Sequence, residues 1–309
     1  KLCDAEEAFR ALSYRNEFLW TSLISGYIKC GKLSHAFFLY HKMQEDSVQP
    51  SGYTFVALIK ACIKLKDVQK ALSLHDDICK LGHERDLFVG SSLVDMYVRF
   101  DMMNKAEEVF EELLVRDAVS WNALISGYSR LGQGEKSLEL YKHMRFEGVS
   151  PTTVTFVCIL KACTSIGDCE KGQEIHAEVS REGLDTNIIV ANTLIDMYGS
   201  FGILTKAHEV FEKLTIRDIV SWTSLISGCA KHGHGEEALN YFLEMCLDGI
   251  SPDAVTLVYG VKACGIIQDI DKGHDLHEVI KMWSLESNSV IGNALVDMYV
   301  KCGMLTKAH

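Results

Sequence analysis

Residues 119–128 read Val-Ser-Trp-Asn-Ala-Leu-Ile-Ser-Gly-Tyr, and related phrases lie 101 residues before and 101 residues after them. The segment Leu-Ile-Ser-Gly-Tyr at 124–128 is repeated at 23–27, and it returns at 225–229 with Cys229 in place of tyrosine. Self-similarity at a fixed period is the signature of a repeat architecture. The same step of 101 separates all three prolines and three of the four tryptophans, which are Pro50, Pro151, Pro252, Trp20, Trp121 and Trp222.

Each 101-residue unit divides into parts of 35, 35 and 31 residues. The phrase Lys-Ala-Cys at 60–62 marks the second part, and Leu-Val-Asp-Met-Tyr at 93–97 marks the third. Both ends of the chain fall inside a part, so we expect a piece of a longer array. The predicted repeats are 17–51, 52–86, 87–117, 118–152, 153–187, 188–218, 219–253 and 254–288, with partial repeats at 1–16 and 289–309.

The part at 118–152 shows the pattern of two helices. Apolar residues at 121, 124, 125 and 128 follow the spacing of one helical face. Gly132 and Gly134 interrupt that stripe, a second one follows at 138, 141 and 144, and Gly148 with Pro151 ends it. Such a hairpin cannot bury its apolar face alone and must stack on its neighbours. We therefore predict an all-α fold, a single continuous α-solenoid of antiparallel helix-turn-helix repeats over 1–309.

The composition excludes several classes of protein. With 48% hydrophobic and 24% charged residues, the chain is that of a folded soluble protein. It has no run of about 18 apolar residues, so we expect no membrane partner. Eleven cysteines without a C-x-x-C pair disfavour a disulfide framework or a zinc ribbon. The net charge of -11 argues against simple polyanion binding and requires an explanation.

With its 35-, 35- and 31-residue hairpins and the phrase at 119–128, the chain resembles the pentatricopeptide repeat proteins of land plants, and more narrowly their PLS subfamily. The units ending at Pro-x resemble its P type, those with Lys-Ala-Cys its L type, and those with Leu-Val/Ile-Asp-Met-Tyr its S type. Tetratricopeptide repeats, with a uniform period of about 34, fit less well. The resemblance implies a right-handed superhelix.

The resemblance also implies a function. Family members bind single-stranded RNA in a sequence-specific manner, one base per repeat, in mitochondria or chloroplasts. PLS members usually act in C-to-U editing of organellar transcripts. The physical basis is sound, because single-stranded RNA exposes its Watson–Crick edges to a helical array. We therefore expect organellar RNA as the partner, together with a cytidine deaminase or other editing factors.

In this family the fifth and the last residue of each repeat read the base. Carried onto this chain, the P-type pairs are Thr21 with Ser51, Asn122 with Thr152, and Thr223 with Asp253. The S-type pairs are Ser91 with Asp117 and Asn192 with Asp218; Asn293 begins a further pair, and Asn16 ends one. The L-type pairs are Val56 with Asp86, Val157 with Asn187, and Val258 with Asn288.

These residue types suit base recognition. Asn, Ser and Thr hydrogen-bond to base edges, whereas Asp accepts from amino and imino groups. Valine has no donor or acceptor, so L repeats are expected to discriminate weakly. In the family, fifth-place Thr or Ser prefers purines, Asn prefers pyrimidines, and a final Asp favours G or U. The expected RNA, from 5′ to 3′, is purine, any, G, pyrimidine, any, U, G, any, pyrimidine.

The resemblance gives the second residue of each repeat a role in wedging against the base. Stacking on an aromatic side chain contributes roughly 1–3 kcal/mol per base. Specificity is therefore expected from the pairs and much of the affinity from this sandwiching. The second residues are Phe18, Tyr53, Phe88, Val119, Val154, Ile189, Val220, Val255 and Val290.

The positions of the charged residues explain how a chain with a net charge of -11 could bind RNA. On a helix the fifth, ninth and thirteenth residues share a face. We expect a basic groove on an acidic body, with acidic runs such as Glu107-Glu108 in second helices, although acidic residues occupy the ninth place of S repeats. Ninth places carry Lys60, Lys161 and Lys262 in L repeats, and Asp95, Asp196 and Asp297 in S repeats; thirteenth places carry Lys29, Lys64, Arg99, Arg130, Lys231 and Lys301.

We expect no catalytic activity, cofactor or metal in this chain. Many PLS proteins carry a cytidine-deaminase-like domain with H-x-E and C-x-x-C zinc ligands. His176-Ala-Glu178 matches the first motif, but no C-x-x-C follows, and His75 and His277 share its place, so a packed histidine is favoured. His232-Gly-His234 is interpreted as a surface turn. Two sets are interpreted as buried core: the tryptophans Trp20, Trp121 and Trp222, and the cysteines Cys62, Cys163 and Cys264.

Two functions of different classes remain open at this point. The first is an RNA-recognition array that positions a transcript for a deaminase elsewhere in the protein or on a partner. The second is a protein-interaction solenoid whose concave face binds a helix or a peptide. Small polar residues at every fifth place of the P and S units favour the first, because a peptide groove tolerates more apolar variation.

Overall fold

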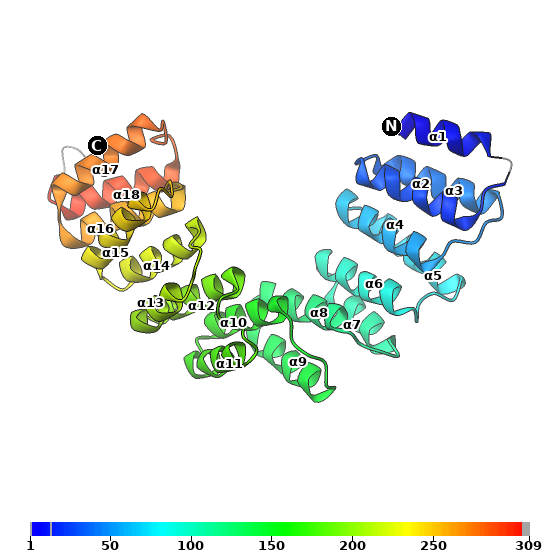
Figure 1. Ribbon diagram of the computed structural model, residues 1–309, viewed down its shortest axis with the longest axis horizontal. Coiled ribbons are helices and arrows are strands. Elements are labelled where there is room, and N and C mark those ends of the chain that lie inside the picture. The colour runs from blue at the N-terminus through cyan, green and yellow to red at the C-terminus, as the bar shows by residue number, and fades with distance from the viewer. Residues whose placement is uncertain (1, 13, 305–309) are drawn as a thin grey trace. The chain divides into compact units, whose positions relative to one another are not determined.

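The computed structural model describes residues 2–12 and 14–304, and every regular element within these ranges is an α-helix (Figure 1). In chain order the helices are α1 (Leu2–Ala11), α2 (Glu17–Lys29), α3 (Leu33–Glu45), α4 (Gly52–Leu65), α5 (Val68–Lys80), α6 (Leu87–Arg99), α7 (Met103–Glu112), α8 (Ala118–Arg130), α9 (Gly134–Phe146), α10 (Thr153–Ile166), α11 (Cys169–Arg181), α12 (Ile188–Ser200), α13 (Leu204–Glu212), α14 (Ile219–Lys231), α15 (Gly235–Leu247), α16 (Ala254–Ile267), α17 (Ile270–Met282) and α18 (Ser289–Lys301).

The first helix of each repeat begins at the first residue of the repeat frame derived from the sequence, from Glu17 in α2 to Ser289 in α18. The all-α prediction is thereby confirmed. Residues 1 and 13 of the first partial repeat and 305–309 of the last lie outside the described residues.

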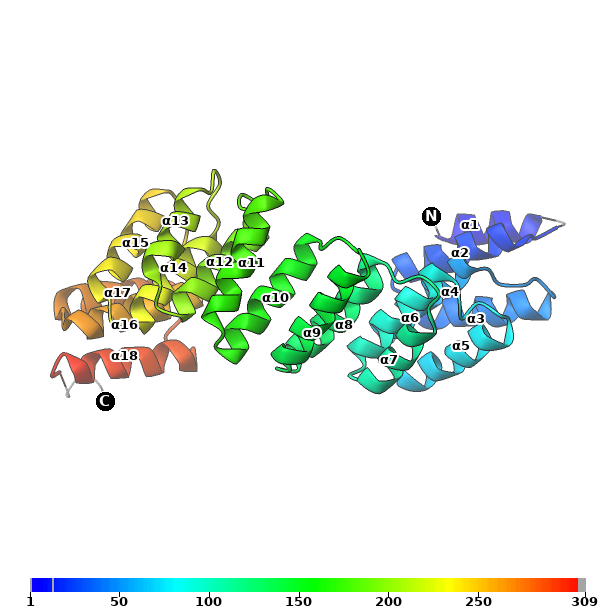
Figure 2. The ribbon, with the colours of Figure 1, turned by 90° about the horizontal axis from the view of Figure 1, so that it is seen from below.

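The chain forms two compact units, residues 1–155 and 156–309, whose boundary falls within α10. Within the first unit α2, α4, α6 and α8 pack in succession, and α3, α7 and α9 each pack on the first helix of their own repeat. The second unit follows the same plan, with α12, α14, α16 and α18 in succession (Figure 1, Figure 2). Each unit is thus a stack of helical hairpins. Continuity of the array across the boundary and the handedness of a superhelix stay predictions.

The apolar stripes form the core between helices. In repeat 118–152 all seven stripe residues, from Trp121 to Met144, are buried. Gly132 ends the hairpin turn with a positive φ of 73°, which glycine adopts without strain. The expectation for Gly134 is wrong, because this residue begins α9 and is buried. Its counterpart Gly235 shows the reason: a Cβ there would lie 2.9 Å from the backbone oxygen of Ala263.

The tryptophans belong to this core, as expected. Each packs edge-on against a phenylalanine from the preceding S repeat, with ring centroids 4.6–4.7 Å apart. An arginine guanidinium lies 4.5–5.2 Å from each phenylalanine centroid, on the ring face. The three stacks, which recur at the period of 101, are Arg15/Phe9/Trp20, Arg116/Phe110/Trp121 and Arg217/Phe211/Trp222.

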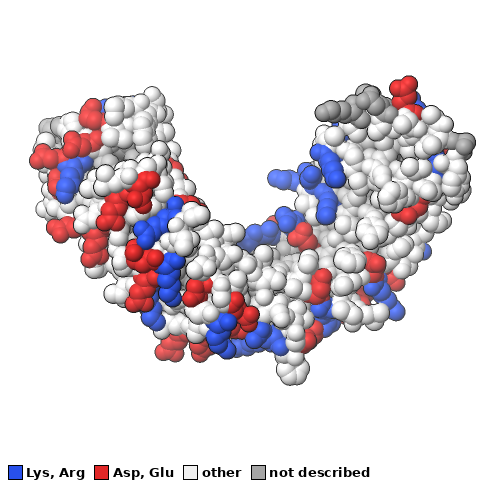
Figure 3. All heavy atoms as spheres, viewed as in Figure 1, with Lys and Arg blue, Asp and Glu red and all other residues white. Residues whose placement is uncertain are grey.

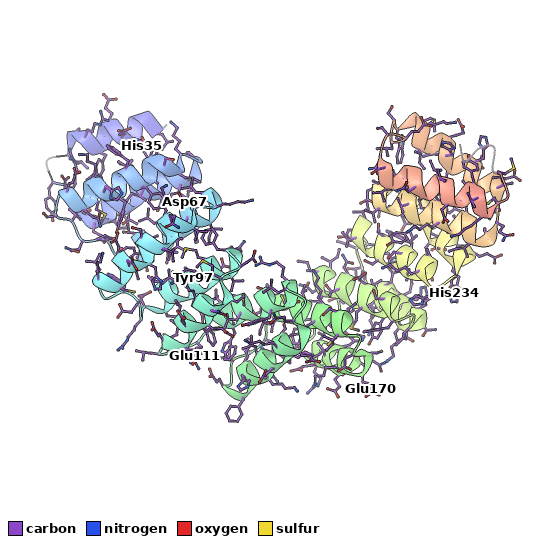
Figure 4. The ribbon with its side chains drawn as sticks, turned by 180° about the vertical axis from the view of Figure 1, so that it is seen from behind. His35, Asp67, Tyr97, Glu111, Glu170 and His234 are labelled. Carbon is purple, nitrogen blue, oxygen red and sulfur yellow. The ribbon has the colours of Figure 1, made fainter. Side chains whose placement is uncertain are left out.

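The histidines of the L repeats are also structural. His75 on α5 shares a hydrogen bond of 2.6 Å with the hydroxyl of Tyr97, which is labelled on α6 in Figure 4. The equivalent bonds are 2.8 Å for His176 with Tyr198, and 2.7 Å for His277 with Tyr299. Each bond ties the second helix of an L repeat to the first helix of the next S repeat.

Candidate nucleic-acid interface

The second residue of each repeat from 17 to 290 is apolar and exposed, although it lies on a first helix that buries most of its other apolar residues. The nine side chains, from Phe18 to Val290, are between 51% and 79% exposed. Single exposed apolar residues are common on protein surfaces, but here the exposure recurs at one position of nine repeats. The structure therefore supplies an apolar side chain at the first turn of each first helix.

The last residue of each repeat is the N-cap of the next first helix. The carboxylates of Asp117, Asp218 and Asp253 accept from the backbone N–H three residues later, at 2.8–2.9 Å. Because this bond satisfies an otherwise unpaired helix donor, it also fixes the direction of the side chain. Asn16, which ends the first partial repeat, caps α2 in the same way, at 3.1 Å from the Leu19 N–H.

The two members of each S-type pair are hydrogen-bonded to each other. Ser91 Oγ donates to Asp117 Oδ1, and Asn192 Nδ2 donates to Asp218 Oδ1, both at 3.1 Å. These fifth residues are more enclosed than an open trough requires, at 4% and 9% exposed. Asn192 Oδ1 is buried and finds no hydrogen-bond partner among the described residues. Asn293 is exposed, and the last residue of its repeat lies beyond the chain.

The P-type pairs meet in a different way. Asn122 Nδ2 donates to Thr152 Oγ1 at 2.9 Å, so this pair is in direct contact. Thr21 lies instead against the hydroxyl of Thr54, with the oxygens 2.6 Å apart, and Ser51 bonds to Glu17. At the third junction Thr223 lies 2.7 Å from the Thr256 hydroxyl, which donates to Asp253 Oδ1 at 2.8 Å.

The sequence interpretation missed the third residue of the repeat that follows each pair. These hydroxyl side chains are fully buried and hydrogen-bond to the last residue of the preceding repeat. Those of Thr54, Thr155 and Ser221 accept the backbone N–H of that residue, a contact that the three-residue spacing of a capping box signals in the sequence. The set comprises Thr54, Ser120, Thr155, Ser221 and Thr256.

The junction after each L repeat is apolar. Val56 and Val157 are partly exposed and Val258 is buried, so no polar fifth residue is present. The last residues turn towards the next helix: a single oxygen of Asp86 accepts the N–H groups of both Phe88 and Val89, each at 3.0 Å. Asn187 and Asn288 repeat this double contact. In these pairs the last residue caps the next helix, and the fifth residue is a valine without a hydrogen-bonding group.

A hollow of about 260 Å³ in the second unit gathers all the elements of one predicted site. It is lined by the pair Thr223 and Asp253 together with the second residues of two consecutive repeats, Val220 and Val255. Lys231 also lines it, and its ammonium lies 5.9 Å from the ring centroid of Tyr259. Asp196, Ser224 and Ser227 line it as well, so the wall carries two carboxylates and one ammonium beside its apolar side chains. Apolar walls with several hydrogen-bonding groups suit a flat, hydrogen-bonding ligand.

The basic residues at ninth and thirteenth places are exposed, but some are neutralised. Arg99 pairs with Asp95 at 2.8 Å, Lys301 with Asp297 at 2.7 Å, and Arg130 with Asp101 at 2.7 Å. Six lysines form no ion pair with a described carboxylate: Lys29, Lys60, Lys64, Lys161, Lys231 and Lys262. Figure 3 shows blue side chains along the edge of the first unit near α2 and α4, and red ones over α13 and α15 in the second.

The recurring cysteines and the histidines of the turn before α15 lie in different surroundings. Burial raises the pKa of the Cys62, Cys163 and Cys264 thiols to about 12, so they are not nucleophiles at neutral pH. His232 and His234 lie in the exposed turn before α15, as expected, and His234 is labelled in Figure 4.

Throughout 2–12 and 14–304, no group of three or more His, Cys, Asp or Glu residues is arranged to hold a metal ion. Of the helices described, none has the length and hydrophobicity of a bilayer-spanning segment.

Comparison with known proteins identifies the repeats. The profile described as "PPR repeat family" matches residues 15–64, 116–165 and 217–265. The profile described as "PPR repeat" matches 53–83, 91–117 and 189–219. A chloroplastic pentatricopeptide repeat-containing protein of Arabidopsis thaliana is 35% identical over 99% of this chain and 36% of its own length. A second chloroplastic relative from the same plant is 32% identical over 100% of this chain and 50% of its own. The chain thus spans at most half of these relatives.

The fold matches solved structures of the same kind. The pentatricopeptide repeat protein PPR10 in complex with an 18-nucleotide psaJ RNA element superimposes with a TM-score of 0.81, at 22% identity, over 99% of this chain and 46% of that one. PPR10 from maize gives a TM-score of 0.81 at 21% identity, over 99% and 45% of the two chains. The likeness establishes a shared helical-repeat fold.

Proposed function

The chain belongs to the pentatricopeptide repeat family, and on that premise we propose that it binds single-stranded RNA sequence-specifically, one base per repeat. The observation that carries the proposal is the exposed apolar second residue in all nine repeats. In each P and S repeat these side chains share a first helix with a polar fifth residue, whose partner caps the next helix. Such a surface holds a base by its faces and reads it by its edge.

The hollow at Thr223 and Asp253 supports this mode of binding for a single base. A base that enters it lies between Val220 and Val255, with its edge towards the pair. Asp253 Oδ1 already accepts from the backbone and the hydroxyl of Thr256. Oδ2 is then the oxygen left to accept from a base, and an acceptor suits the imino and amino groups of guanine.

The S repeats give the most definite assignments. We assign guanine to Ser91 with Asp117 and uracil to Asn192 with Asp218, following the family's tendencies. L repeats are expected to accept any base, since their pairs have a valine in place of the polar fifth residue.

We further propose that the chain belongs to the PLS subfamily and guides organellar RNA processing, most simply C-to-U editing. The names of several relatives, which are called chloroplastic, support an organellar location, with a mitochondrion as the alternative that the family allows. In this proposal the chain recognises the RNA, and the deaminase lies elsewhere in the protein or on a partner.

Equilibrium binding of short RNAs tests the proposal. The probe is a nine-nucleotide single strand of the expected pattern, and the control exchanges G and U at its third, sixth and seventh bases. A base contact of about 1–3 kcal/mol predicts a loss of at least about fivefold for each exchanged base. Equal affinity for both strands, or binding of an amphipathic helical peptide in place of RNA, would refute it.

A further inference from the structure

Three threonines occupy one buried place at the 101-residue period, and each contacts the readout pair of the preceding P repeat rather than that of its own repeat. Thr54, Thr155 and Thr256 are each the third residue of an L repeat and are fully buried. Their hydroxyl oxygens lie 2.6, 2.6 and 2.7 Å from the fifth side chain of the preceding P repeat. The fifth residues concerned are Thr21, Asn122 and Thr223.

The junction between repeats 118–152 and 153–187 shows what this contact does. Thr155 Oγ1 accepts the backbone N–H of Thr152 at 2.8 Å, so its only proton is free to be donated. It is donated to Asn122 Oδ1 at 2.6 Å. Asn122 Nδ2 in turn donates to Thr152 Oγ1 at 2.9 Å. In this arrangement the amide oxygen of Asn122 faces Thr155, the amide nitrogen faces Thr152, and one amide N–H is unused. The two threonine hydroxyls lie 3.2 Å apart, so the three side chains form one network.

We propose that Thr155, and likewise Thr54 and Thr256, are positioning residues that fix the hydrogen-bonding direction of the P-type readout pair. The inference rests on the proposed function, since it concerns the same RNA site. The direction of the Asn122 amide decides whether a base meets a donor or an acceptor. N3 is an acceptor in cytosine and a donor in uracil, so discrimination between these two bases depends on the Thr155 hydroxyl.

The other junctions supply internal controls. Val89 and Val190 occupy the same helical place at the start of S repeats and are fully buried, so valine fits there without a cavity or a clash. Ser120 and Ser221, at the start of P repeats, bond only within the cap and do not reach the fifth residue. The positioning contact is therefore confined to the junctions that follow P repeats.

The test compares wild type, Thr155→Val and Thr155→Ser in binding to four RNAs that differ only at the base opposite repeat 118–152. Thr155→Val removes the hydroxyl, so the Asn122 amide is free to rotate and exchange its oxygen and nitrogen. The preference between cytosine and uracil, measured as the ratio of the two affinities, is therefore expected to fall by about three- to tenfold. Thr155→Ser keeps the hydroxyl and is expected to keep the wild-type ratio. Preferences at the other bases and the melting temperature check that the fold is unchanged.

The outcomes separate the two proposals. A wild-type protein that does not distinguish bases at this position overturns the proposed function, and this inference with it. A wild-type ratio retained by Thr155→Val, or preferences lost at several bases at once, overturns the positioning role alone. If Thr155→Val does not fold, Thr54→Val gives the same test at the base opposite repeat 17–51, where an unchanged preference overturns the inference.

Discussion

The carboxylate of Asp117 serves two structures at once. Its Oδ1 accepts the backbone N–H of Ser120, which caps α8, and also the hydroxyl of Ser91 from the previous repeat. Asp218 does the same for α14 and Asn192. A residue that reads a base must be held in place before the base arrives, and helix capping provides this at no extra cost in ordering the side chain. Readout and repeat stacking are therefore linked through one oxygen atom.

The equivalent geometry of the two S-type pairs predicts the result of an exchange. Asn192→Ser recreates the Ser91/Asp117 pair at the site of Asn192 and Asp218, so preference at that base is expected to move from U towards G. The reciprocal Ser91→Asn is the matched control and is expected to move the other base from G towards U. Selection from a random RNA pool measures both, and an unchanged motif would refute the role given to Asn192.

Affinity and specificity are predicted to reside in different residues. Phe88→Ala removes a stacking surface and is expected to weaken RNA binding by roughly 1–3 kcal/mol while leaving the selected motif unchanged. Phe146→Ala is the matched control, because Phe146 is 92% exposed but ends a second helix. Fluorescence anisotropy with one RNA measures both variants. A reduction in affinity as large for Phe146→Ala as for Phe88→Ala would contradict the role of the second residues.

For the individual readout residues, the sequence predicted the position in the repeat better than the side-chain contacts. The fixed register identified Ser91 with Asp117 and Asn122 with Thr152, which the structure places in direct contact. It did not show that Thr223 reaches Asp253 only through Thr256. The period gives the place of a residue in the helix, but not which of two nearby hydroxyls its side chain meets.

The bonds between His75 and Tyr97 and between His176 and Tyr198 link neighbouring helices and predict a dependence of stability on pH. Burial lowers the pKa of His75 and His176 below the ordinary value of about 6.5. The unfolded chain therefore takes up these protons first as the pH falls. Stability is complete above about pH 6.5 and is lost below it, by up to about 1.4 kcal/mol per pH unit for each histidine.

Chemical denaturation between pH 7.5 and 5 measures this loss. His176→Gln retains a polar side chain that does not titrate, so the stability of the variant is expected to fall less steeply with decreasing pH. Identical slopes for wild type and His176→Gln would contradict the burial argument.

The close contact of α12 and α14 depends on two glycines. A Cβ on Gly228 would lie 2.9 Å from the Cα of Gly199, and backbone cannot move aside as a side chain can. Gly228→Ala is therefore expected to destabilise the protein by about 1–3 kcal/mol. Gly292→Ala in α18 meets nothing closer than 3.9 Å and is expected to stabilise by up to about 1 kcal/mol. Thermal melts that shift in the same direction for both variants would disprove this explanation.

The starts of the first helices could be predicted from the sequence for a physical reason. Each first helix starts after a capping residue such as Asp86 or Asp218, and its apolar spacing then specifies the buried face. Of the two glycines that interrupt the first stripe, Gly132 lies in the turn and Gly134 begins α9, because glycine is also required where helices approach closely. The sequence alone does not separate these two causes.

The acidic chain carries its unpaired cations where the proposed RNA path needs them. Despite the net charge of -11, Lys60 and Lys64 are exposed on the first helix α4 and form no ion pair with a described carboxylate. In the S repeats Arg99 is neutralised by Asp95. Binding is therefore expected to rely on a few interactions with phosphate groups and to show only moderate salt dependence.

Replacement of Lys60 and Lys64 by glutamine tests this distribution. Each lysine that binds a phosphate is expected, once replaced, to reduce the slope of log affinity against log salt by about one, with the selected RNA motif unchanged. Lys142→Gln is the control, because Lys142 is exposed on the second helix α9. A slope that changes equally for Lys142→Gln would show that the lysines act only through the net charge.

The central claim is that one polar pair in each P or S repeat reads one base of a single strand. Selection of binders from a random single-stranded RNA pool, followed by sequencing, tests it most directly. The result predicted is a motif with G opposite 87–117, then a pyrimidine opposite 118–152, any base opposite 153–187, and U and G in succession opposite 188–218 and 219–253. Enrichment of a motif without these bases at this spacing, or of none at all, would contradict the claim.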